Sequence, residues 1–596
     1  MTRTCSLPLS LLAVMLLFAT APAGAKDLPT VEIQQLIEQL GSQEYVARQR
    51  AERELLRLGS EAFDALTAAE QHPDLEVAAR ARYLARRITI DWVRENDPAE
   101  VKRIMSGYDD SDDDARLGRV EQLLALPEGH GIDALVRIVR FEKSPLLSKQ
   151  AAVAWLDSDK TDPQYWRRHQ ERIDRSLGGT RRVAGQWIRA QLKAGQTPEE
   201  SLAEWNRLIE AEQQELAAAP SDANRELVLA LMRRKVALLK QLGKNDDAVA
   251  TMIEMIDLED GDSEALVELV DWLVKQQAWT VIDEVAARFD KQFSSDRSLL
   301  YLLAEARDAQ GAEAKAQELA EQAFQLDPDE PGSHLRAAIY LQKRGRFDWA
   351  EREYRHVIAL GPATSRSTIF TKVWLSEMLH DQADDRAASE VLKELTDAMD
   401  HDATVVQGLQ RIGRDPAAVR SRMEFFFAEH ARSQGEFVKQ KEHLDRAIEH
   451  DPADADVLIA MYHLPNTSDE YQAHTRELIE RAAGQYEELV EEFPDDSTGY
   501  NQYAWLIGNT EGDLDKAIRY SHRSLEIKPN TAGYLDTLAH AYYTKGDYAN
   551  AVRYQQQAVD LDPHVGLIRR PLEKFKAALA SEGGGRKAEG GENAAE

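Results

Sequence analysis

Cysteine is almost absent from this chain. The single cysteine among 596 residues is Cys5, which lies ahead of an apolar run at the start of the sequence. One cysteine cannot build a disulfide framework or a thiolate metal site, and removal of the start of the chain, argued below, would leave no catalytic thiol either. The stability of the folded chain must therefore come from packed apolar surface.

Positive charge is scarce relative to negative charge. The sequence has 73 Lys and Arg residues against 104 Asp and Glu residues, which gives a net charge of −31 at pH 7. Such a surface repels phosphate backbones, and no stripe of basic residues with interleaved aromatic residues compensates for it. We therefore expect no nucleic-acid partner, and we interpret the acidity as solvated helix faces that keep the protein soluble.

Short motifs typical of enzymes and cofactor sites are also missing. The sequence contains no His-Glu-x-x-His, no G-x-S-x-G and no Walker lysine loop, and its 15 histidines do not follow a metal-binding pattern. We therefore predict no catalytic residue, no cofactor-binding residue and no metal ligand.

The acidic stretch DDSDDDARLGRVE is the strongest candidate for a metal site. Its Asp110, Asp112, Asp114 and Glu121 stand at positions 1, 3, 5 and 12 of a calcium-binding loop. The sixth position, where the loop needs glycine for a sharp turn, is Ala115. The alternative is a solvated acidic turn whose last aspartate caps the following helix. Calcium binding, and with it a calcium-dependent surface adhesion module, therefore stays open.

The start of the chain, from Met1 to Ala25, differs from everything after it. One positive charge precedes the uncharged apolar run SLPLSLLAVMLLFATAPA, and small residues follow as far as Ala25. This order is typical of a secretory signal peptide, and the apolar run is short for a membrane span, which an uncleaved anchor would need. We expect export to the periplasm or the extracellular space, with no stable membrane span after cleavage; whether the segment is cleaved or retained as an anchor does not follow from the sequence.

A repeat with a fixed period dominates the second half of the chain. The stretch EGDLDKAIRYSHRSLEIKP begins at Glu511 and returns from Lys545 as KGDYANAVRYQQQAVDLDP, which sets a 34-residue period. The same spacing of Gly, Ala and Pro is found at Gly311, Ala316 and Pro328, and at Gly345, Ala350 and Pro362. In HDQADDRAASEVLKEL we place Ala387 and Leu392 in this register, although the glycine is missing.

Each repeated position fits a helical hairpin. Glycine between two apolar-periodic segments ends the first helix in a left-handed conformation, and alanine early in the second helix lets the two helices approach closely. Proline stops the second helix so that the next unit can begin. Helix-forming residues dominate nearly every segment, so the sequence predicts an all-α fold, an α-solenoid of stacked hairpins.

The segment from about Glu199 to Leu579 resembles tetratricopeptide repeats, with the A-x3-F and proline pattern of that family seen as Ala350, Tyr354 and Pro362. The resemblance implies about eight repeats whose first helices line a concave surface that holds protein or peptide partners. It places these residues on that surface: Tyr301, Glu305, Leu335, Ile339, Gln342, Asp536, His540 and Tyr543. The Lys and Asn pattern with which some members clamp a C-terminal carboxylate is not evident.

The periodicity also predicts the domain organisation. Residues 26–160 are helical but do not follow the 34-residue period, and they resemble short HEAT-type repeats. We expect the following segments: a signal peptide at 1–25, the HEAT-like domain at 26–160, a helical bridge at 161–197, the tetratricopeptide solenoid at 198–580, irregular near 400–418 and 453–497, and a disordered tail at 581–596. The second irregular segment contains one predicted long helix, SDEYQAHTRELIERAAGQYEELVEEF.

These observations favour an exported, non-catalytic scaffold that binds proteins or peptides. Two alternatives stay open: an exported hydrolase or polysaccharide-processing factor with a site in the irregular 400–500 region, and the calcium-dependent adhesion module. The identity of the partner, the pathway and the oligomeric state do not follow from the sequence.

Overall fold

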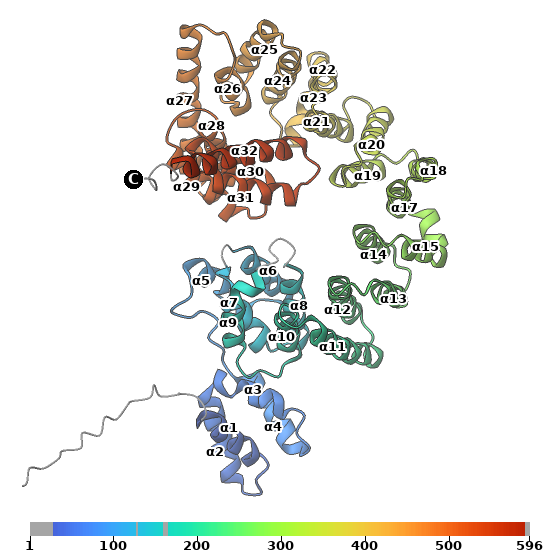
Figure 1. Ribbon diagram of the computed structural model, residues 1–596, viewed down its shortest axis with the longest axis vertical. Helices are drawn as coiled ribbons and strands as arrows, with labels where there is room; N and C mark the ends of the chain where they lie inside the picture. Colours follow the sequence, from blue (N-terminus) through green and yellow to red (C-terminus); the bar gives the residue numbers. More distant parts are fainter. Residues whose placement is uncertain (1–27, 127–128, 159–164, 590–596) are drawn as a thin grey trace, which may run out of the picture. The chain divides into compact units, whose positions relative to one another are not determined.

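The computed structural model describes residues 28–126, 129–158 and 165–589 (Figure 1). All regular structure in these ranges is helical, which confirms the all-α prediction. The predicted signal peptide, residues 1–25, lies outside the described residues. The chain divides into two compact units, Met1–Leu231 and Met232–Glu596. None of the described helices is both long enough and apolar enough to span a membrane.

The first unit consists of short helices in which neighbours along the chain pack together. These are α1 (Leu28–Gln39), α2 (Tyr45–Leu58), α3 (Ser60–Ala69), α4 (Leu75–Arg87), α5 (Ala99–Met105), the 3-10 turn η1 (Tyr108–Asp110), α6 (Asp113–Ala125), α7 (Ile132–Phe141), α8 (Pro145–Asp157), α9 (Tyr165–Leu177), α10 (Val183–Ala194) and α11 (Pro198–Ala218). Large aromatic side chains, Phe63, Trp155 and Trp187 among them, form its core. The likeness of this region to HEAT repeats stays a prediction.

The boundary between the units differs from the expected one at 197/198. It falls within α12 (Asp222–Gln241), because α11 packs against α10. A buried ion pair also fastens α11 to α8: the Lys149 ammonium lies 2.8 Å from the Glu212 carboxylate and 2.7 Å from Glu215. The first helix that the resemblance assigned to the repeats therefore belongs to the first unit.

The second unit is a series of helical hairpins. Its helices are α13 (Asn245–Ile256), α14 (Ser263–Lys275), α15 (Trp279–Arg288), α16 (Asp290–Ser295), α17 (Arg297–Ala309), α18 (Glu313–Phe324), α19 (Pro331–Lys343), α20 (Phe347–Leu360), α21 (Arg366–Asp381), α22 (Asp385–His401), α23 (Ala403–Arg411), α24 (Pro416–Ser433), α25 (Phe437–His450), α26 (Ala455–Tyr462), α27 (Asp469–Glu492), α28 (Ser497–Gly508), α29 (Leu514–Ile527), α30 (Ala532–Lys545), α31 (Tyr548–Leu561) and α32 (Gly566–Glu589). Partners such as α17 and α18 or α30 and α31 pack closely, and first helices of successive hairpins, such as α28 and α30, also touch.

The glycines of the repeat occupy equivalent turns, as the 34-residue spacing predicts. Gly311, Gly345 and Gly546 all have a left-handed backbone, with φ of 76°, 73° and 85°. In each turn the backbone amide of the residue after the glycine donates a hydrogen bond to a carbonyl near the end of the first helix, as the Ala312 amide does to the Arg307 carbonyl. This hydrogen bond satisfies a carbonyl that the helix itself leaves unpaired.

The alanines early in the second helices are buried, as predicted. Ala350 and Ala551 both have an exposed fraction of 0%. In the hairpin of α21 and α22, however, the predicted register is wrong by one position: Ala388, not Ala387, is the fully buried alanine, and Ala383 holds the left-handed turn with φ of 67°. This turn comes later after Gly345 than the period predicts, because α21 is longer than α19.

The irregular segments of the sequence form additional helices. The break near 400–418 contains α23, and the break near 453–497 contains α26 and α27, where α27 is the predicted long helix. At the end of the chain, α32 continues to Glu589, past the expected end of the solenoid at 580. A helix propagates more easily than it nucleates, which accounts for this extension from the packed part of α32.

Candidate functional site

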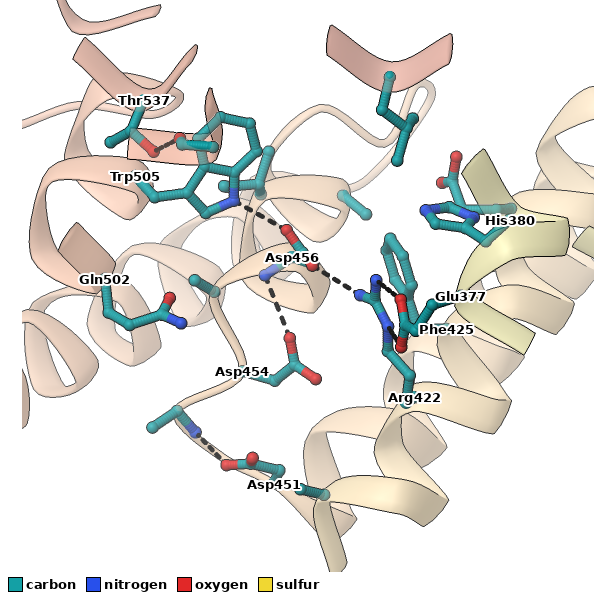
Figure 2. Close-up of a pocket in the computed structure, with 18 of the residues that line it drawn as sticks. Glu377, His380, Arg422, Phe425, Asp451, Asp454, Asp456, Gln502, Trp505 and Thr537 are labelled. Atoms are coloured by element: carbon teal, nitrogen blue, oxygen red, sulfur yellow. Dashed lines mark hydrogen bonds and ion pairs between the residues drawn. The ribbon is translucent and has the colours of Figure 1, made fainter. Parts of the chain in front are cut away.

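A cavity of about 1390 Å³ lies within the second unit. Its walls come from α21, α24, α28 and α30, which are first helices of hairpins, and from α26 and the start of α32 (Figure 2). Both irregular segments contribute to it, since Arg414 and Asp415 follow α23, and Asp456 lies on α26. The breaks in the repeat period are therefore part of the cavity wall.

Arg422 of α24 is the centre of a charge network in the cavity (Figure 2). Its Nε and Nη2 donate to the two carboxylate oxygens of Glu377 over 3.0 and 2.8 Å. Its Nη1 donates to Oδ2 of Asp456 over 2.6 Å. One guanidinium thus serves two carboxylates, and the network keeps a net negative charge.

Asp456 also accepts a hydrogen bond from the opposite wall. The indole Nε1 of Trp505 on α28 donates to its Oδ1 over 2.8 Å (Figure 2). Burial raises the pKa of the Asp456 carboxyl, but the charge of Arg422 and the hydrogen bonds from Trp505 and Arg422 outweigh burial, so the pKa lies below its usual value. Asp456 is therefore ionised and joins α24, α26 and α28.

Asp454 caps the start of α26. Its Oδ1 accepts from the backbone amides of Asp456 and Val457, and its Oδ2 accepts from the Ser421 hydroxyl over 2.9 Å. Burial and the nearby charge of Asp456 raise the pKa of Asp454 to about 6. The two neighbouring aspartates thus have pKa values shifted in opposite directions.

Asp536 and His540 of α30 lie on the far wall of the cavity. Burial raises the pKa of Asp536 to about 7 against the hydrogen bond that Gln555 donates to it over 2.6 Å. Burial, with help from the Lys574 charge, lowers the pKa of His540 to about 3, so its imidazole is neutral at pH 7. The imidazole Nδ1 lies 2.7 Å from Oδ1 of Asn509, which accepts its hydrogen.

The structure therefore brings two of the predicted partner-binding residues, Asp536 and His540, into one cavity. Tyr543 lies one turn further along α30, with its ring stacked on Phe575 of α32 at 4.5 Å between ring centres. The binding role of all three residues stays a prediction.

The other predicted residues lie on α17 and α19 and do not line the cavity. Tyr301 has an exposed fraction of 2%, and its hydroxyl donates to Glu353 over 2.5 Å. Glu305 accepts from Arg344, Gln342 accepts from Tyr354, and Leu335 and Ile339 pack partly buried against the core. In this structure Tyr301 is a packing residue, so it could meet a partner only if its neighbours moved.

Sequence reasoning missed most of the charged residues of the cavity. Glu377 and Arg422 sit inside regular helices and give no motif. Asp451, Asp454 and Asp456 come from the stretch DPADADV, where the period breaks. Asp454 precedes α26 and Asp456 lies in its first turn. Aspartates at the start of a helix are a capping signal, and this signal could have drawn attention to the stretch.

The candidate calcium loop is a helix cap in the structure. Asp112 is the N-cap of α6, and its Oδ1 accepts from the Ala115 amide over 2.9 Å. The capping residue is thus not the last aspartate, Asp114, as the sequence suggested, because α6 begins at Asp113. Within the described ranges, no group of three or more His, Cys, Asp or Glu residues is arranged to hold a metal ion.

Comparison with known proteins gives one family match. The family model described as "Tetratricopeptide repeat" matches residues 532–565, which contain α30 and α31. A search of curated proteins found no match.

Several solved structures are similar at low sequence identity. The TPR domain of P58(IPK) is 17% identical, covers 54% of this chain and 99% of its own, and has a TM-score of 0.16. The TPR2AB domain of yeast Sti1, solved as a pHSP90 complex, is 17% identical, covers 42% of this chain and 98% of its own, and has a TM-score of 0.17. Yeast Tom70 is 12% identical, covers 67% of this chain and 88% of its own, and has a TM-score of 0.24.

The family match coincides with a hairpin whose Gly546 turn and buried Ala551 are as the repeat requires. The chain therefore contains a tetratricopeptide repeat at residues 532–565.

Proposed function

We propose that the chain is an exported, non-catalytic scaffold that binds a segment of a partner protein in the cavity of its second unit. The observation that carries the proposal is the cavity itself, since α21, α24, α28 and α30, which form much of its wall, are first helices of hairpins. Tetratricopeptide repeats are interaction modules whose stacked first helices make such surfaces. The matched repeat contributes Asp536 and His540, among other residues, to the wall.

The charge of the cavity favours a basic partner segment. Its acidic lining residues are Glu377, Asp415, Glu429, Asp451, Asp454, Asp456 and Asp536, and its basic ones are Arg414, Arg422 and Arg432. Since Arg422 already serves Glu377 and Asp456, little positive charge is left to bind an anion. Lysine or arginine side chains of a partner would complement the remaining carboxylates.

Unsatisfied acceptors in the wall point to the same kind of ligand. Gln440 has an exposed fraction of 2%, and its Oε1 is buried without a hydrogen-bond partner. Oδ1 of Asn501 is likewise buried and unpaired, and both residues line the cavity. A buried acceptor without a donor is costly, and N–H groups of a peptide or of a basic side chain would satisfy both.

The test is a binding experiment with two labelled peptides on purified protein. One peptide alternates Arg with Ala, the other alternates Glu with Ala, and fluorescence anisotropy reports binding. Gln502 lines the cavity (Figure 2), so Gln502→Arg adds a positive charge to the wall. Gln322→Arg on the exposed face of α18 is the matched control.

We expect the arginine peptide to bind and the glutamate peptide not to bind. Gln502→Arg should weaken binding by about tenfold or more, because like charges a few ångströms apart repel strongly in a partly buried site, while Gln322→Arg should change little. Equal binding of both peptides, or an equal effect of the two variants, would contradict the proposed site.

Export is the second part of the proposal, and it is supported only by the residue pattern from Met1 to Ala25. N-terminal sequencing of the protein recovered from the envelope of a bacterial host should find the chain beginning after Ala25. Recovery of the full chain, with Met1, from the cytoplasm would contradict export.

Hydrolysis is a second candidate, and one observation favours it. Asp454 and Asp456 lie in the irregular region, and their pKa values are shifted apart, which is a pattern found in acid and base pairs of enzymes. Against this, Asp456 is held by Arg422 and Trp505, and Asp454 caps a helix. Turnover of a chromogenic glycoside or ester that Asp454→Asn abolishes would favour the hydrolase over the scaffold.

A further inference from the structure

The first unit contains a cavity of opposite charge. It has a volume of about 410 Å³ and lies between α3, α4, α8 and α10. Its charged lining residues are Glu70, Arg82, Arg86, Lys143, Lys149, Arg181 and Arg182. The chain as a whole has a net charge of −31, whereas this cavity is lined by six basic side chains and a single carboxylate. Packing alone does not require such a concentration of positive charge.

The walls of this cavity are held by specific contacts. Asp64 of α3 pairs with Arg140 of α7, with 2.6 Å between Oδ2 and Nη2. The rings of Phe63 and Phe141, on the same two helices, meet edge to face at 5.6 Å between centres. Since α7 also packs against α8 and α10, the basic side chains from different helices share one rigid frame.

Three of the basic residues already have carboxylate partners. Lys149 is paired with Glu212 and Glu215, Lys143 lies 3.4 Å from Asp109, and Arg82 lies 3.6 Å from Glu70. These pairs leave Arg86, Arg181 and Arg182, for which the described residues supply no ion-pair partner. The positive charge that is free to act on a ligand therefore comes from arginine.

Arg182 is the most informative of the three. Its Nη1 donates to the backbone carbonyls of Arg140 and Glu142, and its guanidinium lies 5.7 Å from the centre of the Phe63 ring. Burial lowers the pKa of Arg182, and the carboxylates of Glu142, Asp64 and Glu70 only partly oppose burial. A partly desolvated arginine without a paired carboxylate is costly unless an anion binds to it.

The backbone of α10 adds to the positive potential. Arg182 is the N-cap residue of α10, and no side chain caps the first amides of that helix. Val183 and Ala184, the first residues of α10, line the cavity. Free amides and the helix dipole favour an anion at this end of a helix.

The cavity also has an apolar part, formed by Phe63, Ala68, Ala85, Pro145 and Val183. Its volume is within the range of cavities that hold small organic molecules. A bare ion would leave this surface uncovered, whereas an anionic group on a small apolar body would contact both the arginines and the apolar wall.

We propose that this cavity binds an oxyanion, a carboxylate or a phosphate monoester carried on a small organic group, through Arg86, Arg181 and Arg182. The planar guanidinium matches both oxyanions with paired hydrogen bonds. The site does not depend on the peptide-binding role of the second unit. Its positive lining would attract anions, although the net charge of the chain is negative.

The test is isothermal titration of the full mature chain at low ionic strength with three probes: inorganic phosphate, phenyl phosphate and benzoate. Arg86 and Arg181 are exposed, so Arg86→Ser and Arg181→Ser should not disturb folding. Arg103→Ser, at an exposed position of α5 outside the cavity, removes the same charge and is the matched control.

We expect phenyl phosphate or benzoate to bind more tightly than inorganic phosphate. Each cavity variant should weaken binding by about tenfold, the usual loss for one charged hydrogen bond, and Arg103→Ser should leave it unchanged. Tighter binding of phenyl phosphate than of benzoate identifies a phosphate monoester as the ligand, and the reverse order identifies a carboxylate. Absence of binding by all three probes, or equal losses in the cavity variants and the control, would overturn the proposal.

Discussion

Replacing Gly311 with alanine should destabilise the second unit, although the new methyl group meets no neighbour. Gly311 turns the chain between α17 and α18 with φ of +76°, and a Cβ added there finds nothing within 4 Å. The whole cost is therefore conformational. A left-handed backbone costs an L-residue about 1–2 kcal/mol, and the reduced entropy of unfolded alanine returns about 0.5–1 kcal/mol, so we expect a net loss of about 1 kcal/mol.

Two further variants show whether backbone conformation is the cause. Gly484 is exposed within α27 and also has open space around it, so Gly484→Ala should stabilise the unit by about 1 kcal/mol through helix propensity. Ala383 holds the equivalent left-handed turn without glycine, with φ of +67°, so Ala383→Gly should stabilise the unit by about 1 kcal/mol. The two glycine-to-alanine changes thus have opposite signs, and the reverse change at the turn is favourable.

Urea unfolding followed by circular dichroism measures the free energy of unfolding, and hydrogen exchange measured by mass spectrometry locates the change. The local readout is needed because a repeat array can unfold in parts. For Gly311→Ala, exchange should rise in peptides that cover the α17–α18 turn. The reasoning fails if Gly311→Ala and Gly484→Ala shift stability in the same direction.

Three further changes test packing, titration and capping. Ala350→Leu should cost about 1–3 kcal/mol in thermal unfolding, because Ala350 is fully buried and added carbon atoms overpack the hairpin; a neutral result would contradict the register. Asp536 has a pKa raised to about 7 by burial, so its protonated form favours folding below about pH 4 and stability is lost as pH rises from about 4 to about 7. As pH rises across that window, the free energy of unfolding of the Asp536→Asn variant should therefore increase relative to that of the unaltered chain, by about 1.4 kcal/mol per pH unit. A difference between the two proteins that does not change with pH would refute the assignment. Asp112→Ala should cost about 1 kcal/mol by uncapping α6, whereas Asp114→Ala should cost less; equal losses would argue against the cap.

The hairpins were predictable because the sequence records their backbone needs directly. Glycine at 311, 345 and 546 marks a turn that other residues adopt only with strain, and the structure has left-handed backbone at each. Where alanine takes the turn at 383, the signal is lost, and the predicted register is wrong by one position. The repeat period therefore predicts the register of a hairpin reliably only where glycine occupies the left-handed turn.

The cavity was less predictable because its charged residues depend on contacts across irregular segments. Asp536 and His540 could be placed from the regular repeat. Arg422 could not be placed, since its partner Glu377 is 45 residues away, off the 34-residue period, and its partner Asp456 lies in an irregular segment. The charge state of such a group depends on how deeply its side chain is buried and on which charged side chains contact it, and both depend on the tertiary structure.

Helix capping accounts for part of the acidity of the cavity. Asp415 caps α24 and Asp454 caps α26, and both line the cavity; Asp451, another lining residue, accepts the amide of Ala453 just before α26. Aspartate is a preferred cap because its carboxylate accepts free amides and opposes the helix dipole. Helices that begin at the cavity therefore bring negative charge to it, whatever the partner. Several capping aspartates would then contribute together to the preference for a basic ligand. The affinity for such a ligand should decline stepwise as these aspartates are replaced by asparagine, which caps a helix without carrying a charge.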